Sequence, residues 1–439
     1  MTPGAASPGR VPVPSFAQER RVRAVCGGQP PGAAALAKTI PLVCRLPEPV
    51  DVAAMDAAVQ AFIERHPALR WRFLFQDGVV SLRGPVAASA VGGVRCLVTD
   101  AADLPDGPGA ELHYIRKQVD RPFDVVGWPL LRAGLVRSDR PLFYLSMDHL
   151  VTDAWSLSVA MTQIRALYDA ARDGRSVQLP PAGDYLDFSA AQRREFADGP
   201  ALHHRLAGFQ RTLRGRPVHP PLPVRPGSWN LASGRYVTLH LLDPSQADAF
   251  ARRCRIGRAT YFMGALAALG TALRELGGNA DVGVLIATHN RGATGAADGV
   301  GWYANMLPVY FRAADSSGFA ETLSEVRRGL MAVLDHHDLP LPRILESLPA
   351  DLNGAAGEHP SCFVSFTDDR SDAPSSAGAA WQRVYMAPAY RVGYGIWFSL
   401  NDNGLQAEIA SPGVTGAEAP LADLERRLGE VLCRMAAQG

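Results

Sequence analysis

The sequence feature that most constrains the fold is the apolar run VGVLIAT at residues 282–288. Its length suits one β-strand, and a run without alternating polar residues is typical of a central strand covered on both faces. Residues 260–276 form an apolar segment rich in Ala and Gly, which predicts a helix buried on most sides. Patterns of strand and helix are mixed through the whole chain, so we expect an α/β (or α+β) protein.

Further elements follow from periodicity and turn residues. Apolar residues spaced by three and four predict a helix over 51–64, limited by Pro67 because proline cannot continue a hydrogen-bonded turn. A Gly in the turn at 76–78 predicts a hairpin between strands 71–75 and 79–82. Additional patterns predict strands at 130–137, 142–147, 236–242, 362–366 and 395–400, and an amphipathic helix at 420–436.

The length of 439 residues suggests two or three domains at roughly 100–200 residues each. We expect an N-terminal half at 15–180 and a C-terminal half at 181–439. Residues 1–14 are rich in Pro, Gly and Ser, which predicts disorder. Five prolines within 216–228 predict a stiff, extended crossover inside the second half.

Composition excludes several function classes. Lys and Arg number 44 against 43 for Asp and Glu, so the chain lacks the basic surplus typical of nucleic-acid binding. The sequence contains no run of about 20 apolar residues, so no membrane span is predicted. The N-terminus also lacks the apolar core of a signal peptide. We therefore expect a cytoplasmic protein. The six cysteines form no CxxC motif, so reduced thiols are expected and no metal site.

The residues with the clearest chemical meaning lie in MDHLVTDAWS at 147–156, where the patterns predict a turn from strand to helix. His149 has the one side chain whose unperturbed pKa lies near neutrality, so it can accept a proton from an amine or hydroxyl. Asp153 follows four residues later and would orient the ring or tie the turn to another segment. By itself His-x-x-x-Asp is a weak signal, since most single histidines have a structural role.

Other candidate sites have simpler interpretations. His203 and His204 lie in a polar helical pattern and are expected in solvent. The group at 336–338 resembles a metal cluster, but adjacent histidines do not easily face one ion. Ser15 lacks a G-x-S-x-G context and Cys362 lacks an identifiable base, so neither is expected as a nucleophile. Without a P-loop or G-x-G-x-x-G motif, no nucleotide cofactor is expected.

The string at 147–156 resembles the MHHxxxDGWS motif of the condensation domains of nonribosomal peptide synthetases, within the His-motif acyltransferases. Six further stretches resemble family signatures in the expected order: 15–20 (SxAQxR), 65–73 (RHxxLRxxF), 121–132 (PFDL then PLxR), 185–188 (YxDFA), 300–308 (GxFxNxLPLR) and 336–341 (HQDxPF). The ordered set identifies the chain as a member of this family, although no single match would.

The resemblance implies two chloramphenicol-acetyltransferase-like halves in a V-shaped pseudo-dimer, with a central tunnel that admits phosphopantetheine arms. It implies that His149 is the catalytic histidine in the tunnel. It also implies that Asp153 is structural and pairs with Arg291 across the halves. Asp148, Ala154, Trp155 and Ser156 flank the motif and are expected near the tunnel.

Two residues depart from the family motif. Asp148 replaces the first histidine, and Ala154 replaces the glycine. If the Asp148 carboxylate lies beside His149, it favours the imidazolium and weakens the base. If it points away from the tunnel, it would pair with a cation instead. The extra methyl group of Ala154 would narrow the tunnel.

The resemblance predicts a free-standing condensation enzyme with no bound cofactor. An acyl or aminoacyl thioester would arrive on a carrier protein in trans, and the acceptor would be an amine or hydroxyl, carrier-bound or a small molecule. His149 would accept the acceptor's proton, while the backbone after His149 and the Trp155 region would stabilise the oxyanion. Two alternatives remain open: a non-catalytic module that recruits a carrier protein or tailoring enzyme, and an acyl-CoA-dependent O-acyltransferase.

Overall fold

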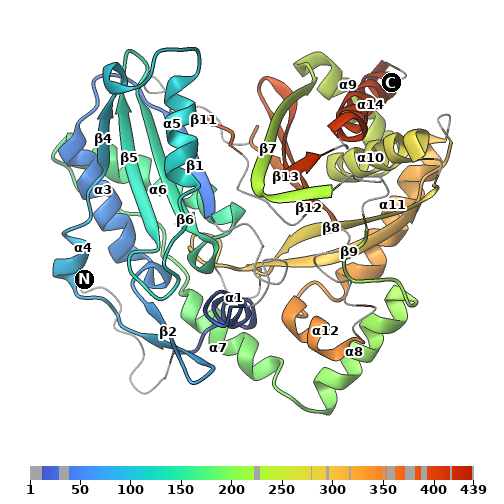
Figure 1. Cartoon of the computed structure of the whole chain (residues 1–439), viewed down its shortest axis with the longest axis horizontal. Coiled ribbons are helices and arrows are strands. Elements are labelled where there is room, and N and C mark those ends of the chain that lie inside the picture. The colour runs from blue at the N-terminus through green and yellow to red at the C-terminus, as the bar shows by residue number, and fades with distance from the viewer. Residues whose placement is uncertain are drawn as a thin grey trace. The chain divides into compact units, whose positions relative to one another are not determined.

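The computed structural model describes residues 12–28, 39–221, 228–277, 279–292, 296–315, 318–349, 352, 361–370, 381–386, 393–415 and 418–437. The chain forms two compact units (Figure 1). The first unit comprises Met1–Asp198, His289–Ala304 and Pro374–Ala389, and the second comprises the remaining three segments, Gly199–Thr288, Asn305–Ala373 and Tyr390–Gly439. Both units therefore contain segments that are distant in sequence.

The first unit is built on a five-stranded sheet in the order β11-β1-β6-β5-β4. Its strands are β1 (Thr39–Arg45), β4 (Leu97–Asp100), β5 (Leu131–Arg137), β6 (Leu142–Asp148) and β11 (Gln382–Val384). β6 pairs antiparallel with β1 and β5, and all its residues are buried. This central strand leads directly into His149.

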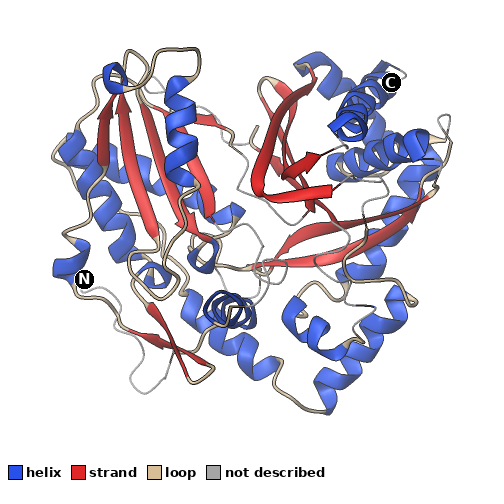
Figure 2. Cartoon of the chain, viewed as in Figure 1, coloured by secondary structure: helices blue, strands red, loops and turns tan. Residues whose placement is uncertain are grey.

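Helices cover both faces of this sheet, as Figure 2 shows. Phe143, Leu145 and Met147 of β6 pack in the core that contains α3 (Val52–Arg65) and α6 (Ala154–Arg172). Leu142 and Tyr144 pack on the opposite face in the core that contains α5 (Ala110–Val119). The alternation follows from the two-residue period of a strand.

The remaining elements of the first unit are short or peripheral. α1 (Phe16–Cys26), α4 (Ala88–Val91) and α7 (Tyr185–Glu195) are helices, and η1 (Pro67–Leu69), η2 (Ala101–Asp103) and η3 (His149–Val151) are 3₁₀ turns. β2 (Arg72–Gln76) and β3 (Val79–Arg83) form the predicted hairpin. Its turn holds Asp77 at φ 50° and Gly78 at φ 76°, a left-handed pair that glycine adopts readily.

The second unit contains a six-stranded sheet in the order β7-β13-β12-β10-β8-β9. Its strands are β7 (Ser228–Leu242), β8 (Asp281–His289), β9 (Ala304–Arg312), β10 (Ser361–Asp368), β12 (Gly393–Asn401) and β13 (Gly404–Thr415). Its helices are α8 (Pro200–Leu213), α9 (Pro244–Ile256), α10 (Tyr261–Gly277), α11 (Phe319–Leu334), α12 (Leu341–Ser347) and α14 (Glu418–Ala437). The apolar run that predicted a central strand is β8, between β10 and β9, and the predicted buried helix is α10.

The mixed α/β class is confirmed, and each strand and helix predicted above has a counterpart. The predicted halves are continuous in sequence, whereas the observed units are not; the division into halves at 15–180 and 181–439 stays a prediction, as do the V shape and the tunnel. Of the predicted disordered terminus and Pro-rich crossover, residues 1–11 and 222–227 lie outside the described residues. Among the described helices, none has the length and apolar character needed to cross a membrane.

Candidate active site

The turn between β6 and α6 is fixed by two N-caps in close succession. Asp148 caps η3, with its carboxylate accepting from the Leu150 N–H at 2.9 Å. Asp153 caps α6 and accepts from the N–H of Ser156 at 2.8 Å and from its hydroxyl at 2.8 Å. Because a cap satisfies N–H groups that a helix leaves unpaired, both caps stabilise the turn. His149 lies between the two caps, which fix its backbone.

A hydrogen bond fixes the tautomer of His149. Its Nδ1 lies 2.8 Å from the carbonyl oxygen of Thr152. A carbonyl oxygen only accepts, so Nδ1 carries the proton and Nε2 of the neutral ring keeps its lone pair. The ring also packs against Trp302, with centroids 4.2 Å apart and planes inclined by 33°. The result is a half-buried imidazole whose Nε2 can accept a proton.

The surroundings of His149 favour its neutral form. Burial lowers the pKa of this imidazole below its ordinary value, and the positive charge of Arg21 lowers the pKa further. The carboxylates of Asp153 and Asp148 act in the opposite direction but do not outweigh these two causes. At neutral pH the ring is therefore a base rather than a cation.

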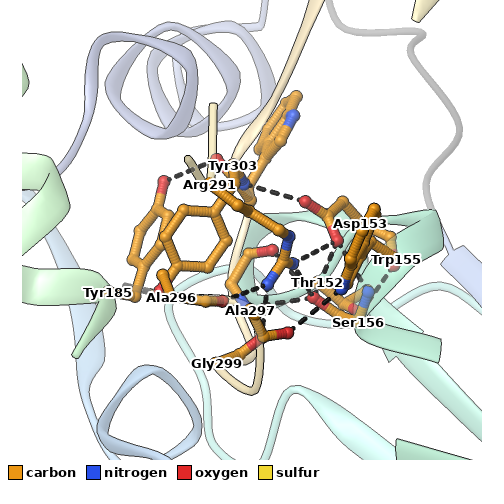
Figure 3. A network of polar contacts seen from close by, with 12 residues as sticks. Thr152, Asp153, Trp155, Ser156, Tyr185, Arg291, Ala296, Ala297, Gly299 and Tyr303 are labelled. Atoms are coloured by element: carbon orange, nitrogen blue, oxygen red, sulfur yellow. Dashed lines mark hydrogen bonds and ion pairs between the residues drawn. The ribbon is translucent and has the colours of Figure 1, made fainter. Parts of the chain in front are cut away.

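The predicted contact between Asp153 and Arg291 is present and lies in a buried polar network (Figure 3). The guanidinium Nη2 is 2.7 Å from the Asp153 carboxylate, and the two side chains are only 3% and 2% exposed. Arg291 also donates to the carbonyl oxygens of Ala296 at 2.9 Å and Gly299 at 2.6 Å. The second Asp153 oxygen accepts from the Tyr303 N–H at 3.0 Å. The network joins the N-terminus of α6 to the segment His289–Ala304.

The expectation that this pair spans two halves needs correction. Arg291 follows β8, a strand of the second unit, but the segment His289–Ala304 belongs to the first unit, like Asp153. Sequence order placed the two residues in different halves because it does not show that the chain returns to the first unit after β8.

Trp155, Ser156 and Ala154 complete the sequence-predicted set. Trp155 is 44% exposed, and its indole N–H donates to the Ala297 carbonyl at 3.0 Å (Figure 3). Ser156 is buried, and its hydroxyl lies 3.1 Å from the Gly301 carbonyl. Ala154 is exposed, so its methyl group disturbs no packing in the structure. That this methyl group narrows a tunnel stays a prediction.

Asp148 pairs with Arg21 of α1, which decides between the two alternatives for this residue. Its carboxylate oxygens lie 3.1 Å from Nε and 2.9 Å from Nη2 of Arg21, and both side chains are buried. The alternative in which Asp148 pairs with a cation is the one observed; its carboxylate still raises the pKa of His149, but burial and Arg21 outweigh this effect. Of the groups expected to stabilise an oxyanion, the Leu150 N–H already donates to Asp148 and the Trp155 indole N–H donates to a carbonyl; a role for the other backbone N–H groups after His149 stays a prediction.

Comparison with known proteins places this geometry in a family. The family model described as Condensation domain matches residues 37–366. The chain belongs to the condensation-domain family. Phosphinothricin tripeptide synthetase PhsC of Streptomyces viridochromogenes is 30% identical over 312 residues, which cover 69% of this chain and 28% of that protein. The chain spans less than a third of the length of the curated relatives it matches.

Solved structures support the same fold. The PapA2 acyl transferase has a TM-score of 0.79 at 20% identity, over 99% of this chain and 98% of that chain. The first condensation domain of the calcium-dependent antibiotic synthetase, in complex with a substrate analogue, also has a TM-score of 0.79 at 20% identity, over 98% and 97% of the two chains. At this identity the likeness concerns the fold alone.

The condensation-domain site includes residues that the sequence analysis did not assign. Trp302 lies within the 300–308 motif match, so the signal was present, but its packing on His149 was not foreseen. Tyr185, within the 185–188 match, donates to the Trp302 carbonyl at 3.0 Å. No local sequence pattern indicated a role for Arg21, because its partner Asp148 lies 127 positions away along the chain.

The surroundings of the remaining candidates agree with their simpler interpretations. Ser15 caps α1 in a capping box with Gln18, and burial raises the pKa of the Cys362 thiol to about 12, so neither acts as a nucleophile. His203 and His204 are exposed on α8. Asp338 forms an ion pair with Arg205. Among the described residues, no group of three or more His, Cys, Asp or Glu could hold a metal ion.

Proposed function

We propose that this chain is an acyltransferase of the condensation type. It transfers an acyl or aminoacyl group from the phosphopantetheine thioester of a carrier protein to an amine or hydroxyl, and forms an amide or ester. The observation that carries the proposal is the geometry of His149, whose Nδ1 donates to the Thr152 carbonyl and so leaves Nε2 as the nitrogen that can accept a proton. A scaffold that only binds a partner has no need of a histidine held in this state.

In the proposed mechanism, Nε2 of His149 accepts the proton of the acceptor as its nitrogen or oxygen attacks the thioester carbonyl. The bond from acceptor to carbonyl carbon forms, and the carbon–sulfur bond then breaks. The thiolate of the carrier arm leaves and recovers the proton from the imidazolium, so no covalent acyl-enzyme is needed. General-base help of this kind typically contributes about 10²–10⁴-fold in rate. The Thr152 carbonyl stabilises the imidazolium that forms in between.

Asp153 serves this mechanism by holding the turn and not by moving protons. One of its carboxylate oxygens accepts from Arg291 and from the Ser156 backbone and hydroxyl, and the other accepts from the Tyr303 N–H. A carboxylate with these donors on both oxygens is held in one orientation.

The test is metabolite profiling of the strain that carries the gene, with His149→Ala in place of the natural residue. Loss of the mature product and accumulation of an uncondensed precursor are expected, and the precursor's mass identifies the missing bond. His203→Ala is the matched control, because His203 is exposed on α8 and is expected to leave production unchanged. Melting of both purified variants shows that each has folded.

Two other outcomes would identify a different function. If production survives His149→Ala but fails when the gene is deleted, the chain acts as a recruitment module, an alternative suggested by Asp148 and Ala154 in the motif. If the purified protein uses acyl-CoA but not a loaded carrier protein, and forms an ester, it is an acyl-CoA-dependent O-acyltransferase.

A further inference from the structure

A buried ion pair lies next to the proposed catalytic histidine and belongs to none of the motif roles above. Arg21 of α1 presents Nε and Nη2 to the two carboxylate oxygens of Asp148, at 3.1 and 2.9 Å. The side chains are 4% and 2% exposed. A parallel, two-point contact of this kind fixes orientation as well as charge. Burial also protects the pair from screening by salt.

The same helix holds the histidine turn at a second point. Gln18, one turn before Arg21 on α1, donates from Nε2 to the Leu150 carbonyl at 2.7 Å. Leu150 in turn donates its N–H to Asp148 at 2.9 Å. The residues on both sides of His149 are therefore tied to one face of α1. A shift of α1 would move the imidazole with it.

The start of α1 is also linked to the ring that packs on His149. The Tyr185 hydroxyl lies 2.9 Å from the Ser15 hydroxyl and donates to the Trp302 carbonyl at 3.0 Å. Ser15 is the N-cap of α1 and closes a capping box with Gln18. Through these contacts α1 supports both the backbone of His149 and the indole against which its ring packs.

The charges of the pair have opposite effects on the imidazole. Arg21 lowers the pKa of His149, whereas Asp148 raises it, and Asp153 is the other charged group that raises it. An unpaired carboxylate at position 148 would therefore shift His149 toward the imidazolium, which cannot act as a base.

We propose that Arg21 is a positioning residue of this site, which acts through Asp148 to hold the turn that carries His149 and to compensate the carboxylate next to the imidazole. Asp148, one partner of this pair, occupies the position of the first histidine in the family motif. The inference rests on the proposed role of His149, but its test does not require acyl transfer.

The experiment measures carbethoxylation of His149 by diethyl pyrocarbonate, which reacts with neutral imidazole, by peptide mass spectrometry between pH 5 and 8. Arg21→Met removes the cation and leaves the carboxylate, so the midpoint of the pH profile is expected to move up by as much as about one pH unit, which lowers the rate on the acidic side of the profile by up to about tenfold. Asp148→Asn leaves the cation and is expected to move the pH profile to lower pH. Arg21→Lys, which keeps the charge, should restore most of the wild-type profile.

The double variant R21M/D148N keeps the test sound if a single variant fails to fold, because neither charge is left buried and unpaired. Its rate at pH 6 is expected to lie between those of the wild type and Arg21→Met. The matched control is Arg137→Met, which breaks an exposed two-point pair with Asp100 in the same unit and should leave His149 unaffected.

Opposite shifts of the two single variants support the inference, since a purely structural role would move both profiles in the same direction. Shifts in the same direction, an unchanged profile in Arg21→Met, a double variant that reacts more slowly than Arg21→Met, or an equal effect of Arg137→Met would overturn it. Failure of the proposed function appears elsewhere: His149→Ala would then still make product, whatever the carbethoxylation profile shows.

Discussion

His66 shows how one buried residue makes the stability of the fold depend on pH. Burial lowers its pKa from 6.5 to about 4, and Nε2 lies 2.8 Å from Oε1 of Gln163. The folded state therefore keeps the ring neutral, whereas the unfolded chain binds a proton below about pH 6.5. The stabilisation is complete above that pH and is lost as the pH falls toward 4. Between pH 7 and 5 the free energy of unfolding should fall by about 2 kcal/mol from this residue.

Urea denaturation at pH 7 and pH 5 measures this loss, with His66→Gln as the comparison. The variant cannot bind the proton, so its stability should fall less between the two pH values than that of the wild type. His203→Gln, at an exposed position, should keep the wild-type dependence. Equal pH dependence in the wild type and His66→Gln would contradict the prediction.

At the scale of residues, the ordered motif matches led to His149 and Asp153, and the family resemblance led to Arg291, which is in contact with Asp153. Neither led to Arg21. The partner of Arg21 lies on a strand 127 positions away, and a long-range ion pair leaves no local pattern. The sequence also left two environments open for Asp148, because only the structure shows which cation the carboxylate meets.

At the scale of elements, the Asp153–Arg291 pair attaches the segment His289–Ala304 to the start of α6. Asp153→Asn leaves the Arg291 guanidinium buried without its counterion. Arg291→Met leaves the Asp153 carboxylate buried without its counterion. Breaking a buried pair in this way typically costs about 3–5 kcal/mol of stability. Chemical denaturation should show losses of this order for both variants. The exposed pair of Arg426 and Glu430 is the control, and Arg426→Met should leave the transition unchanged. Losses below about 1 kcal/mol in both buried variants would refute the prediction.

Elements with a clear apolar period were predicted from sequence, and those whose burial depends on polar contacts were not. α10 and β8 consist of residues that must avoid water on nearly every side, so composition alone indicated them. α1 has the sequence FAQERRVRAVC, without a broad apolar stripe, although Gln18 and Arg21 are buried in it. β11 has only three residues, and its pairing with β1 joins Val384 to Val43, a contact without a sequence signal.

At the scale of the whole molecule, the first unit is completed by residues from late in the chain. Trp302 and Tyr303 are buried in its core, and so is Trp381, which packs on Phe143 at 5.9 Å between ring centroids. A fragment of residues 1–198 contains the sheet strands β1, β4, β5 and β6 but none of these three rings, and it lacks the Arg291 counterion of Asp153. The fragment should therefore not reach the native packing of the unit.

The expected loss of folding free energy in the fragment is large compared with the stability of a domain. Removal of one large aromatic side chain from a core typically costs about 3–5 kcal/mol, and an unpaired buried charge costs a similar amount. Their sum is comparable with the whole stability of an ordinary domain, about 5–15 kcal/mol. We expect fragment 1–198 to show weak near-ultraviolet circular dichroism and rapid proteolysis. A synthetic peptide of residues 287–305, which supplies Arg291, Trp302 and Tyr303, should restore part of both properties. A cooperative thermal transition of the fragment alone would show instead that the first 198 residues carry enough core to fold, and that the later segments serve only the site.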